Sequence, residues 1–385
     1  MGARLAKAIF GVRWKELQVL VPGLVLAVAL ALFAMWVSTA LGESLLGYEK
    51  SPISSVMLAI LLGLLVRNLF PLPGWFQPGL AFAVKKILRW GIILLGIRLS
   101  IFDVLHLGAM GIPVVLACIV GALAITSFLA RRLSIPNRLG TLIGVGTSIC
   151  GVSAIVAAAP TIDAKDEEVA YAIAVITVFG MFATLAYPYL AELLFAGDPV
   201  KVGLFLGTSV HDTSQVTGAA MVYAQVYAEP RGLDIAIVTK LVRNVFMAGV
   251  IPLTALLYAR RDASGTLGRR PPFRKLLPLF VVGFLALAIL RSIGDAGLSG
   301  GGKALGLLST EAWDQAVAGI KQWAGYLLVV ALAGVGLNTQ FRRLSRLGIK
   351  PFVVGLVAAI LVGAISYGIV TILAITGGIE GLKSG

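Results

Sequence analysis

Nine long apolar segments constrain this chain more than any other feature of its sequence. Each is long enough to cross a hydrocarbon core as a helix, which takes roughly 17 to 25 residues. They lie at 17–41, 53–70, 84–102, 105–130, 168–196, 235–258, 276–293, 317–339 and 352–376. With 58% hydrophobic and 13% charged residues, the 385-residue chain has too little polar surface for a soluble globule. We therefore expect an all-α integral membrane protein with a single multi-pass domain over residues 1–385.

The net charge of +14 is concentrated in the connections between these segments. Basic clusters lie at 1–15, 131–138, 259–275 and 341–350, whereas 42–52 and 294–316 contain few lysines and arginines. The positive-inside rule then predicts a cytoplasmic N-terminus and an external C-terminus. We expect no nucleic-acid partner, because no basic patch is interleaved with aromatic residues on a soluble domain. The first apolar segment is longer than the core of a signal peptide, which favours a retained helix over a cleaved signal.

Two similar stretches of small and polar residues interrupt the apolar pattern. GTSICGVSAIVAAA at 146–159 and GTSVHDTSQVTGAA at 207–220 align without a gap. The similarity continues into the next helix after a small shift in register, where 171–188 parallels 235–252. We interpret residues 139–196 and 200–258 as an internal repeat. The alternative is a coincidence of small residues, which are enriched where membrane helices pack.

A weaker similarity joins LLGIRLSIFDVLHLG at 94–108 with LAGVGLNTQFRRLSRLG at 332–348. Loop charges orient these two segments in opposite directions, as in transporters with inverted repeats. Each GTS signature either dips into the membrane and returns as a broken, re-entrant element, or crosses it fully. We favour dipping elements, which would place the 161–168 loop in the cytoplasm and the 196–200 loop outside.

The residue types in the signatures predict breaks in their helices. Glycine admits backbone angles closed to other residues, and serine and threonine hydroxyls can bond freed backbone groups. The N-terminal ends of half-helices attract anions, and their C-terminal ends attract cations. The alternative is a close-packed crossing of glycine- and serine-rich helices. The predicted substrate-binding residues are Gly146, Thr147, Ser148, Ser153, Gly207, Thr208, Ser209, His211, Ser214, Gln215, Lys240, Arg243 and Asn244.

Polar residues are concentrated in the second copy of the repeat. Lys240, Arg243 and Asn244 stand at i, i+3 and i+4 and therefore share one helix face. Arg243 lies roughly 12 Å inside its span, where a charge costs about 2.5 to 3.5 kcal/mol. We predict Asp212 as its ion-pair partner and as the candidate residue for a coupling Na⁺ or H⁺. One carboxylate and two cations leave a surplus of about +1, which an anionic substrate would neutralise; the alternative is a purely structural Asp212–Arg243 pair.

Signatures of enzymes, metal sites and cofactors are not convincing. Ser209, His211, Asp212 and Ser214 adjoin in sequence, but the members of a catalytic triad must converge in space. GLSGGGKA at 297–304 resembles a phosphate-binding loop but has Ala304 where a magnesium-binding hydroxyl is needed. We expect no catalytic residue, no metal and no cofactor.

The stretches GTSICGVSAIVAAAP, GTSVHDTSQVTGAA and KLVRNVFMA resemble the YeiH-type sulfate exporter family of bacterial inner-membrane proteins, and the likeness covers nearly the whole chain. That family looks like a distant branch of the bile acid/sodium symporter and sodium/proton antiporter superfamily, whose members carry two broken elements that cross near mid-membrane. The resemblance implies a panel-and-core architecture with alternating access. This chain departs from the superfamily's usual order, because a single predicted span separates its two signatures.

The sequence thus predicts a secondary active transporter that exports a small anion, such as sulfate or an organosulfonate, across the inner membrane. A sodium- or proton-coupled carrier of another organic anion is an alternative. So are the membrane subunit of an ion-pumping decarboxylase and a scaffold without transport activity. The expected partners are a small anion, the lipid bilayer and a coupling Na⁺ or H⁺, and the chain could form an oligomer.

Overall fold

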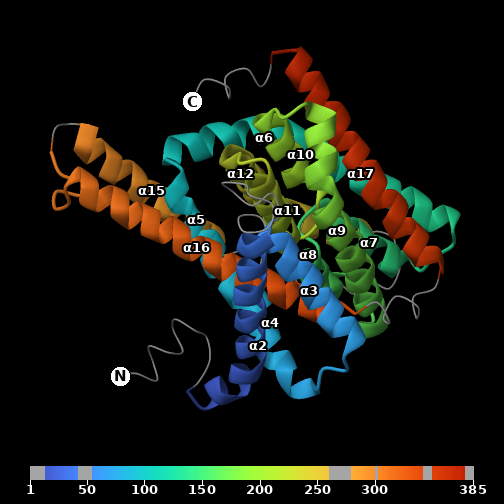
Figure 1. The fold of residues 1–385 in the computed structure, drawn as a ribbon. Coiled ribbons are helices and arrows are strands. Elements are labelled where there is room, and N and C mark those ends of the chain that lie inside the picture. The colour runs from blue at the N-terminus through green and yellow to red at the C-terminus, as the bar shows by residue number, and fades with distance from the viewer. Residues whose placement is uncertain (1–13, 42–53, 260–278, 300–301, 341–348, 378–385) are drawn as a thin grey trace. The chain divides into compact units, whose positions relative to one another are not determined.

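The computed structural model describes residues 14–41, 54–259, 279–299, 302–340 and 349–377 (Figure 1). In this part of the chain, helices are the regular structure, apart from one isolated β-bridge between Ala304 and Leu308. The chain divides into two compact units. Unit 1 falls within residues 1–101, 225–227 and 282–341, and unit 2 falls within 102–224, 228–281 and 342–385.

Seven helical segments of the described chain are long and apolar enough to cross a membrane. They are Gln18–Thr39, Ile101–Arg132, Asp166–Phe195, Pro230–Leu256, Leu279–Ser299, Thr310–Asn338 and Ile349–Ile375. The predicted span at 53–70 is shorter than expected, because its helix ends where Phe70, which precedes Pro71, is extended. The predicted span at 84–102 is divided into short α, π and 3₁₀ segments that end at Arg98. The expectation of nine long spanning helices is therefore corrected to seven in the described residues.

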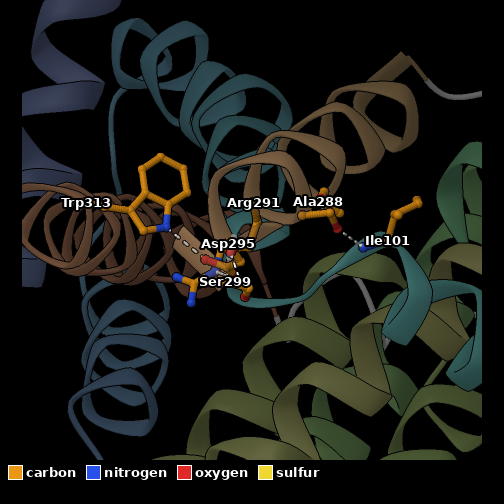
Figure 2. A network of polar contacts seen from close by, with 7 residues as sticks. Ile101, Ala288, Arg291, Asp295, Ser299 and Trp313 are labelled. Carbon is orange, nitrogen blue, oxygen red and sulfur yellow. Dashed lines mark hydrogen bonds and ion pairs between the residues drawn. The ribbon is translucent and has the colours of Figure 1, made fainter. Parts of the chain in front are cut away.

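Unit 1 is held together by close helix crossings. Its elements are α2 (Trp14–Thr39), α3 (Ser55–Leu69), α4 (Gln77–Phe82), α5 (Leu88–Leu95), α15 (Leu279–Ser299) and α16 (Thr310–Asn338). A Cβ atom on Gly63 of α3 would lie 2.7 Å from the carbonyl oxygen of Ala333 in α16, so the two backbones touch. A polar network joins α15 to α16 (Figure 2). The Asp295 carboxylate of α15 accepts from Trp313 Nε1 of α16 at 2.9 Å and from Arg291 Nε of its own helix at 2.6 Å.

Unit 2 contains both GTS signatures. Its elements are α6 (Ile101–Arg132), α7 (Asn137–Ser148), α8 (Val152–Ala158), α9 (Asp166–Phe195), α10 (Pro199–Ser209), α11 (Thr213–Val226), α12 (Pro230–Val245), α13 (Met247–Ala259) and α17 (Ile349–Ile375). Helix α17 packs beside α7, α9 and α10 (Figure 1). The predicted repeat therefore corresponds to α7–α8–α9 in its first copy and to α10–α11–α12–α13 in its second.

The first signature forms a helical hairpin, here called hairpin 1 (α7 and α8, residues 137–158). Arg138, at the start of α7, donates from Nη2 to Asp163 Oδ2 at 3.4 Å, just after the hairpin ends. A Cβ atom on Gly146 would lie 2.8 Å from Ile155 Cδ1, so the ends of the two arms near the break are also in contact. The chain therefore returns to the side from which it entered.

The second signature forms hairpin 2 (α10 and α11, residues 199–226) in the same way. Asp198 caps α10 by accepting from the N–H groups of Val200 and Lys201. A Cβ atom on Gly232, near the start of α12, would lie 2.8 Å from the Tyr223 ring and 3.7 Å from the carbonyl oxygen of Pro199. The start of α10 and the last turns of α11 thus lie together.

The two hairpins enter unit 2 from opposite ends of α9. This helix has 30 residues and is therefore about 45 Å long. Hairpin 1 precedes its first residue and hairpin 2 follows its last, as expected of inverted copies. That each hairpin dips into the membrane and returns stays a prediction. The side of the membrane from which each hairpin enters stays a prediction, and the weaker similarity cannot be followed because 341–348 lies outside the described residues.

Candidate functional site

The candidate site lies where the breaks of the two hairpins meet α12. Lys240, Arg243 and Asn244 lie on one face of α12, as their spacing predicted, and each side chain is at most 1% exposed. Breaking a helix frees carbonyl groups at the end of its first half. The breaks after α7 and α10 therefore present unpaired carbonyl oxygens inside unit 2, close to these buried cations.

Arg243 binds four of the freed carbonyl oxygens. Its Nε donates to Ser148 O at 2.7 Å, and its Nη1 donates to Thr208 O at 2.7 Å and to Val210 O at 3.3 Å. Its Nη2 donates to Thr147 O. The planar guanidinium therefore joins the C-terminal end of α7 to that of α10.

Lys240 binds the next carbonyl oxygens along both breaks. Its Nζ donates to Ile149 O at 2.9 Å, to Val210 O at 3.2 Å and to His211 O. All three neighbours are carbonyl acceptors, an arrangement that matches the three N–H donors of an ammonium group. Lys240 thus joins the two breaks as Arg243 does.

The two cations follow the symmetry of the repeat. Thr147 and Thr208 are equivalent positions of the two signatures, and Arg243 binds the carbonyl oxygens of both. Ile149 and Val210 are equivalent in the same alignment, and Lys240 binds both. A single helix, α12, therefore supplies cations to equivalent positions in both hairpins, whereas the equivalent helix α9 has Ile176 and Phe179 at the corresponding positions.

The hydroxyl groups of the signatures do not bond the backbone groups freed by the breaks, although their role in substrate binding stays a prediction. Each donates to a carbonyl of its own helix three or four residues earlier, which is a common bond for buried serine and threonine. Thr208 also shares a hydrogen bond of 2.6 Å with Ser366 of α17. The prediction that hydroxyls satisfy the freed backbone groups was wrong, because the longer Lys240 and Arg243 side chains reach those groups instead. The in-helix bonds are Thr147–Ile143, Ser148–Val145, Thr208–Leu204 and Ser209–Phe205.

Asp212 is not the ion-pair partner of Arg243. Among the ion pairs of the described chain, none joins these two residues. Asp212 Oδ1 instead accepts from Ser214 N at 2.9 Å and from Ser214 Oγ at 2.6 Å, so it caps the N-terminus of α11. The break leaves Asp212 at the positive end of α11, where a carboxylate is favoured. The predicted pair is therefore corrected to a helix cap.

The two breaks touch at Gly151 and Asp212. Gly151 has φ +65°, a conformation that favours glycine, and a Cβ atom there would lie 3.0 Å from Asp212 Oδ2. Gly146 and Gly207 also serve close packing, since a Cβ on Gly207 would lie 2.8 Å from the carbonyl oxygen of Ala236 in α12. Substrate binding by these two glycines stays a prediction.

Gln215 fixes the tip of hairpin 2 to α9. Its Oε1 accepts from Asp212 N at 3.2 Å, and its Nε2 donates to Thr177 O at 2.9 Å. Gly180 makes room for this amide, because a Cβ atom there would lie 1.9 Å from Oε1. Neither Thr177 nor Gly180 was among the predicted site residues. The available signal was the repeat, which aligns Gly180 with the polar Asn244.

Two buried side chains at the site retain unused hydrogen-bonding atoms. His211 Nδ1 and Asn244 Oδ1 are buried without a hydrogen-bond partner in the described residues. The Asn244 Nδ2 group donates to Thr213 Oγ1 at 3.3 Å. Ser153, in contrast, is exposed on α8 and does not share the burial of this cluster. Buried polar atoms without partners are uncommon, so they indicate where a ligand or water could bind.

A metal site has no support in the described residues, which contain no group of three or more His, Cys, Asp and Glu side chains able to hold an ion.

Comparisons with known proteins indicate a family of membrane proteins. A family model described as Conserved hypothetical protein 698 matches residues 22–355. The chain is similar to UPF0324 membrane protein FN0533 of Fusobacterium nucleatum subsp. nucleatum, with 31% identity over 84% of this chain and 91% of that protein. It is also similar to UPF0324 membrane protein spyM18_1033 of Streptococcus pyogenes serotype M18, with 31% identity over 92% of this chain and 95% of that protein. No solved structure matches. These descriptions name no substrate, and the YeiH-type name and the superfamily link stay predictions.

Proposed function

Because the chain belongs to the family described as Conserved hypothetical protein 698, we propose that this bacterial multi-pass membrane protein is a secondary transporter of a small anion. Sulfate and organosulfonates are the first substrates to test, given the resemblance of the two signatures. Two inverted, broken hairpins that meet inside one unit support the proposal. Broken backbone at membrane depth is tolerated where it is buried in protein or lines a water-filled cavity, and in transporters it binds substrates and ions.

The charge at the meeting point is the observation that carries the proposal. Lys240 and Arg243 contribute two positive charges, and Asp212 contributes one negative charge. The four half-helix ends cancel, because the C-terminal ends of α7 and α10 each carry about −0.5 and the N-terminal ends of α8 and α11 each carry about +0.5. A net charge of about +1 therefore remains in a region from which water is largely excluded. A bound anion would neutralise it.

The freed carbonyl oxygens at the site, which would attract a cation, are already bound to Lys240 and Arg243. The unused atoms are His211 Nδ1, which donates or accepts according to its tautomer, and Asn244 Oδ1, which only accepts. A bound anion would therefore rely on the charge of the two cations and on the His211 ring, and not on the Asn244 oxygen. Because Asp212 is committed to capping α11, its proposed role as a coupling-ion residue has less support than the role of the two cations in anion binding.

A thermal-stability screen of the purified protein across anions tests the proposal. Sulfate, organosulfonates, carboxylates and phosphate are compared with chloride at constant ionic strength, and the anion that raises the melting temperature is then used for flux in proteoliposomes. We expect a saturable rise for at least one anion in the wild-type protein. The absence of a rise for every anion, together with no flux, would refute the proposal.

Arg138→Gln is a matched control for Arg243→Gln in this screen. Both changes remove one arginine charge from unit 2, but Arg138 pairs with the exposed Asp163 at the entrance of hairpin 1. We expect anion-dependent stabilisation to survive in Arg138→Gln and to disappear in Arg243→Gln. Equal loss in both variants would show that the effect reflects overall charge and not the site. Copurification of a soluble biotinylated or decarboxylase subunit would instead favour the decarboxylase alternative.

A further inference from the structure

Three main-chain carbonyl oxygens surround the nitrogen of Lys240 as ligands surround a small cation. Ile149 O comes from hairpin 1, whereas Val210 O and His211 O come from hairpin 2. All lie at the negative, C-terminal side of a broken helix. The Lys240 side chain is 1% exposed, so the group at the centre of this cage is shielded from water.

Such a cage has the composition of a monovalent-cation site. Unwound carbonyls and the C-terminal ends of half-helices coordinate the driving Na⁺ in several transporter folds. In this chain, an ammonium group with the same single charge already occupies that position. Lysine can do so because its charge is compact and lies at the end of a flexible four-carbon chain.

We propose that Lys240 fills a monovalent-cation site with a covalently attached cation, and that removal of its side chain opens this site to Na⁺ or K⁺. The cage itself follows from the contacts of Lys240. The consequence for transport rests on the proposed function: the position cannot take up and release a coupling Na⁺, so anion movement does not depend on Na⁺ binding there.

Lys240→Ala tests the proposal, because alanine removes the four outer atoms of the side chain. The change leaves Ile149 O and His211 O without the Lys240 donor, and Val210 O with only the Arg243 Nη1 donor at 3.3 Å. Melting temperature is measured in detergent while N-methylglucamine chloride is replaced by NaCl or KCl at constant ionic strength. We expect the variant to melt below the wild-type protein in N-methylglucamine, and its melting temperature to rise saturably with Na⁺ or K⁺. The wild-type protein should show no such saturable rise.

Lys240→Met is the matched control. Methionine fills most of the space but supplies neither charge nor room for an ion, so this variant should be destabilised equally in all three salts. A Lys240→Ala protein that responds to the cations no more than Lys240→Met would overturn the proposal. So would a Lys240→Ala protein that cannot be purified folded in any salt although Lys240→Met can. Because chloride is the common anion throughout, failure of the anion screen would leave this result unaffected.

Discussion

Two replacements of Arg243 distinguish the effect of its charge from that of its hydrogen bonds: Arg243→Gln removes the charge and part of the hydrogen bonds, whereas Arg243→Lys keeps the charge. The guanidinium donates to four main-chain carbonyl oxygens, those of Thr147, Ser148, Thr208 and Val210. Val210 O keeps a donor from Lys240 Nζ, and a glutamine amide has two N–H donors and a shorter reach, so Arg243→Gln leaves at least one of the other three carbonyls unpaired. At about 1 to 3 kcal/mol for each buried group left unpaired, we expect a loss of at least about 1 to 3 kcal/mol in the free energy of unfolding.

Arg243→Lys keeps the positive charge but loses the planar fork. We expect it to be less destabilised than Arg243→Gln, because a cation near the C-terminal ends of α7 and α10 still contributes about 0.3 to 1 kcal/mol at each end. Anion-dependent stabilisation should persist in the lysine variant, since it follows the buried charge, and should be lost in the glutamine variant.

The assay is denaturant- or heat-induced unfolding of the purified variants in one detergent, with and without the stabilising anion. Arg138→Gln serves again as the control for loss of a surface charge, where an exposed pair contributes about 0 to 1 kcal/mol. If Arg243→Gln were as stable as Arg138→Gln, the inference that Arg243 holds the two hairpins together would be refuted. If the anion still stabilised Arg243→Gln as strongly as it stabilises the wild-type protein, the role of Arg243 in anion binding would be refuted.

Three further predictions concern the hairpins. Single cysteines at Ala196 and Ala228, in a background without Cys118 and Cys150, should react with an impermeant thiol reagent from the same side of the membrane; labelling from opposite sides would contradict the re-entrant geometry of hairpin 2. Gly180→Ala should destabilise the protein by about 1 to 3 kcal/mol in unfolding experiments, because its Cβ would lie 1.9 Å from Gln215 Oε1. Adding Gln215→Ala should recover part of that loss, whereas additive losses would contradict the contact. Asp212→Asn should change the free energy of unfolding by less than about 1 kcal/mol, because asparagine caps helices as well as aspartate does; a loss as large as that of Arg243→Gln would indicate a buried ion pair after all.

Much of the secondary structure could be predicted from the hydrophobic pattern. The long segments at 105–130, 168–196 and 352–376 are continuous helices, since their apolar residues extend far enough to cross a membrane. The pattern failed at 53–70 and 84–102. Proline at 71 limits the first of these, and the second contains a tight contact of Gly96 with the Phe284 carbonyl of α15, a residue distant in sequence.

The candidate site could be predicted only in part. The spacing of Lys240, Arg243 and Asn244 placed them on one buried face, and the repeated GTS signatures located both breaks. Asp212, the carboxylate within the second signature, was a natural expectation for Arg243, because a buried cation needs a counter-group. Sequence spacing does not reveal that main-chain carbonyl oxygens can be that counter-group, because every residue carries one.

The sequence by itself determined that this chain is a membrane protein, that it repeats a broken helical element, and that two cations lie deep in it. These properties follow from composition and periodicity, which act through burial of each segment in lipid or protein. Only the tertiary structure decided which groups those cations bind. Arg243 and Lys240 reach carbonyls that lie 91 to 96 residues away in hairpin 1 and 29 to 35 residues away in hairpin 2. Such contacts exist only once both helices have broken and folded back, because an intact helix would keep the same carbonyls in its own hydrogen bonds.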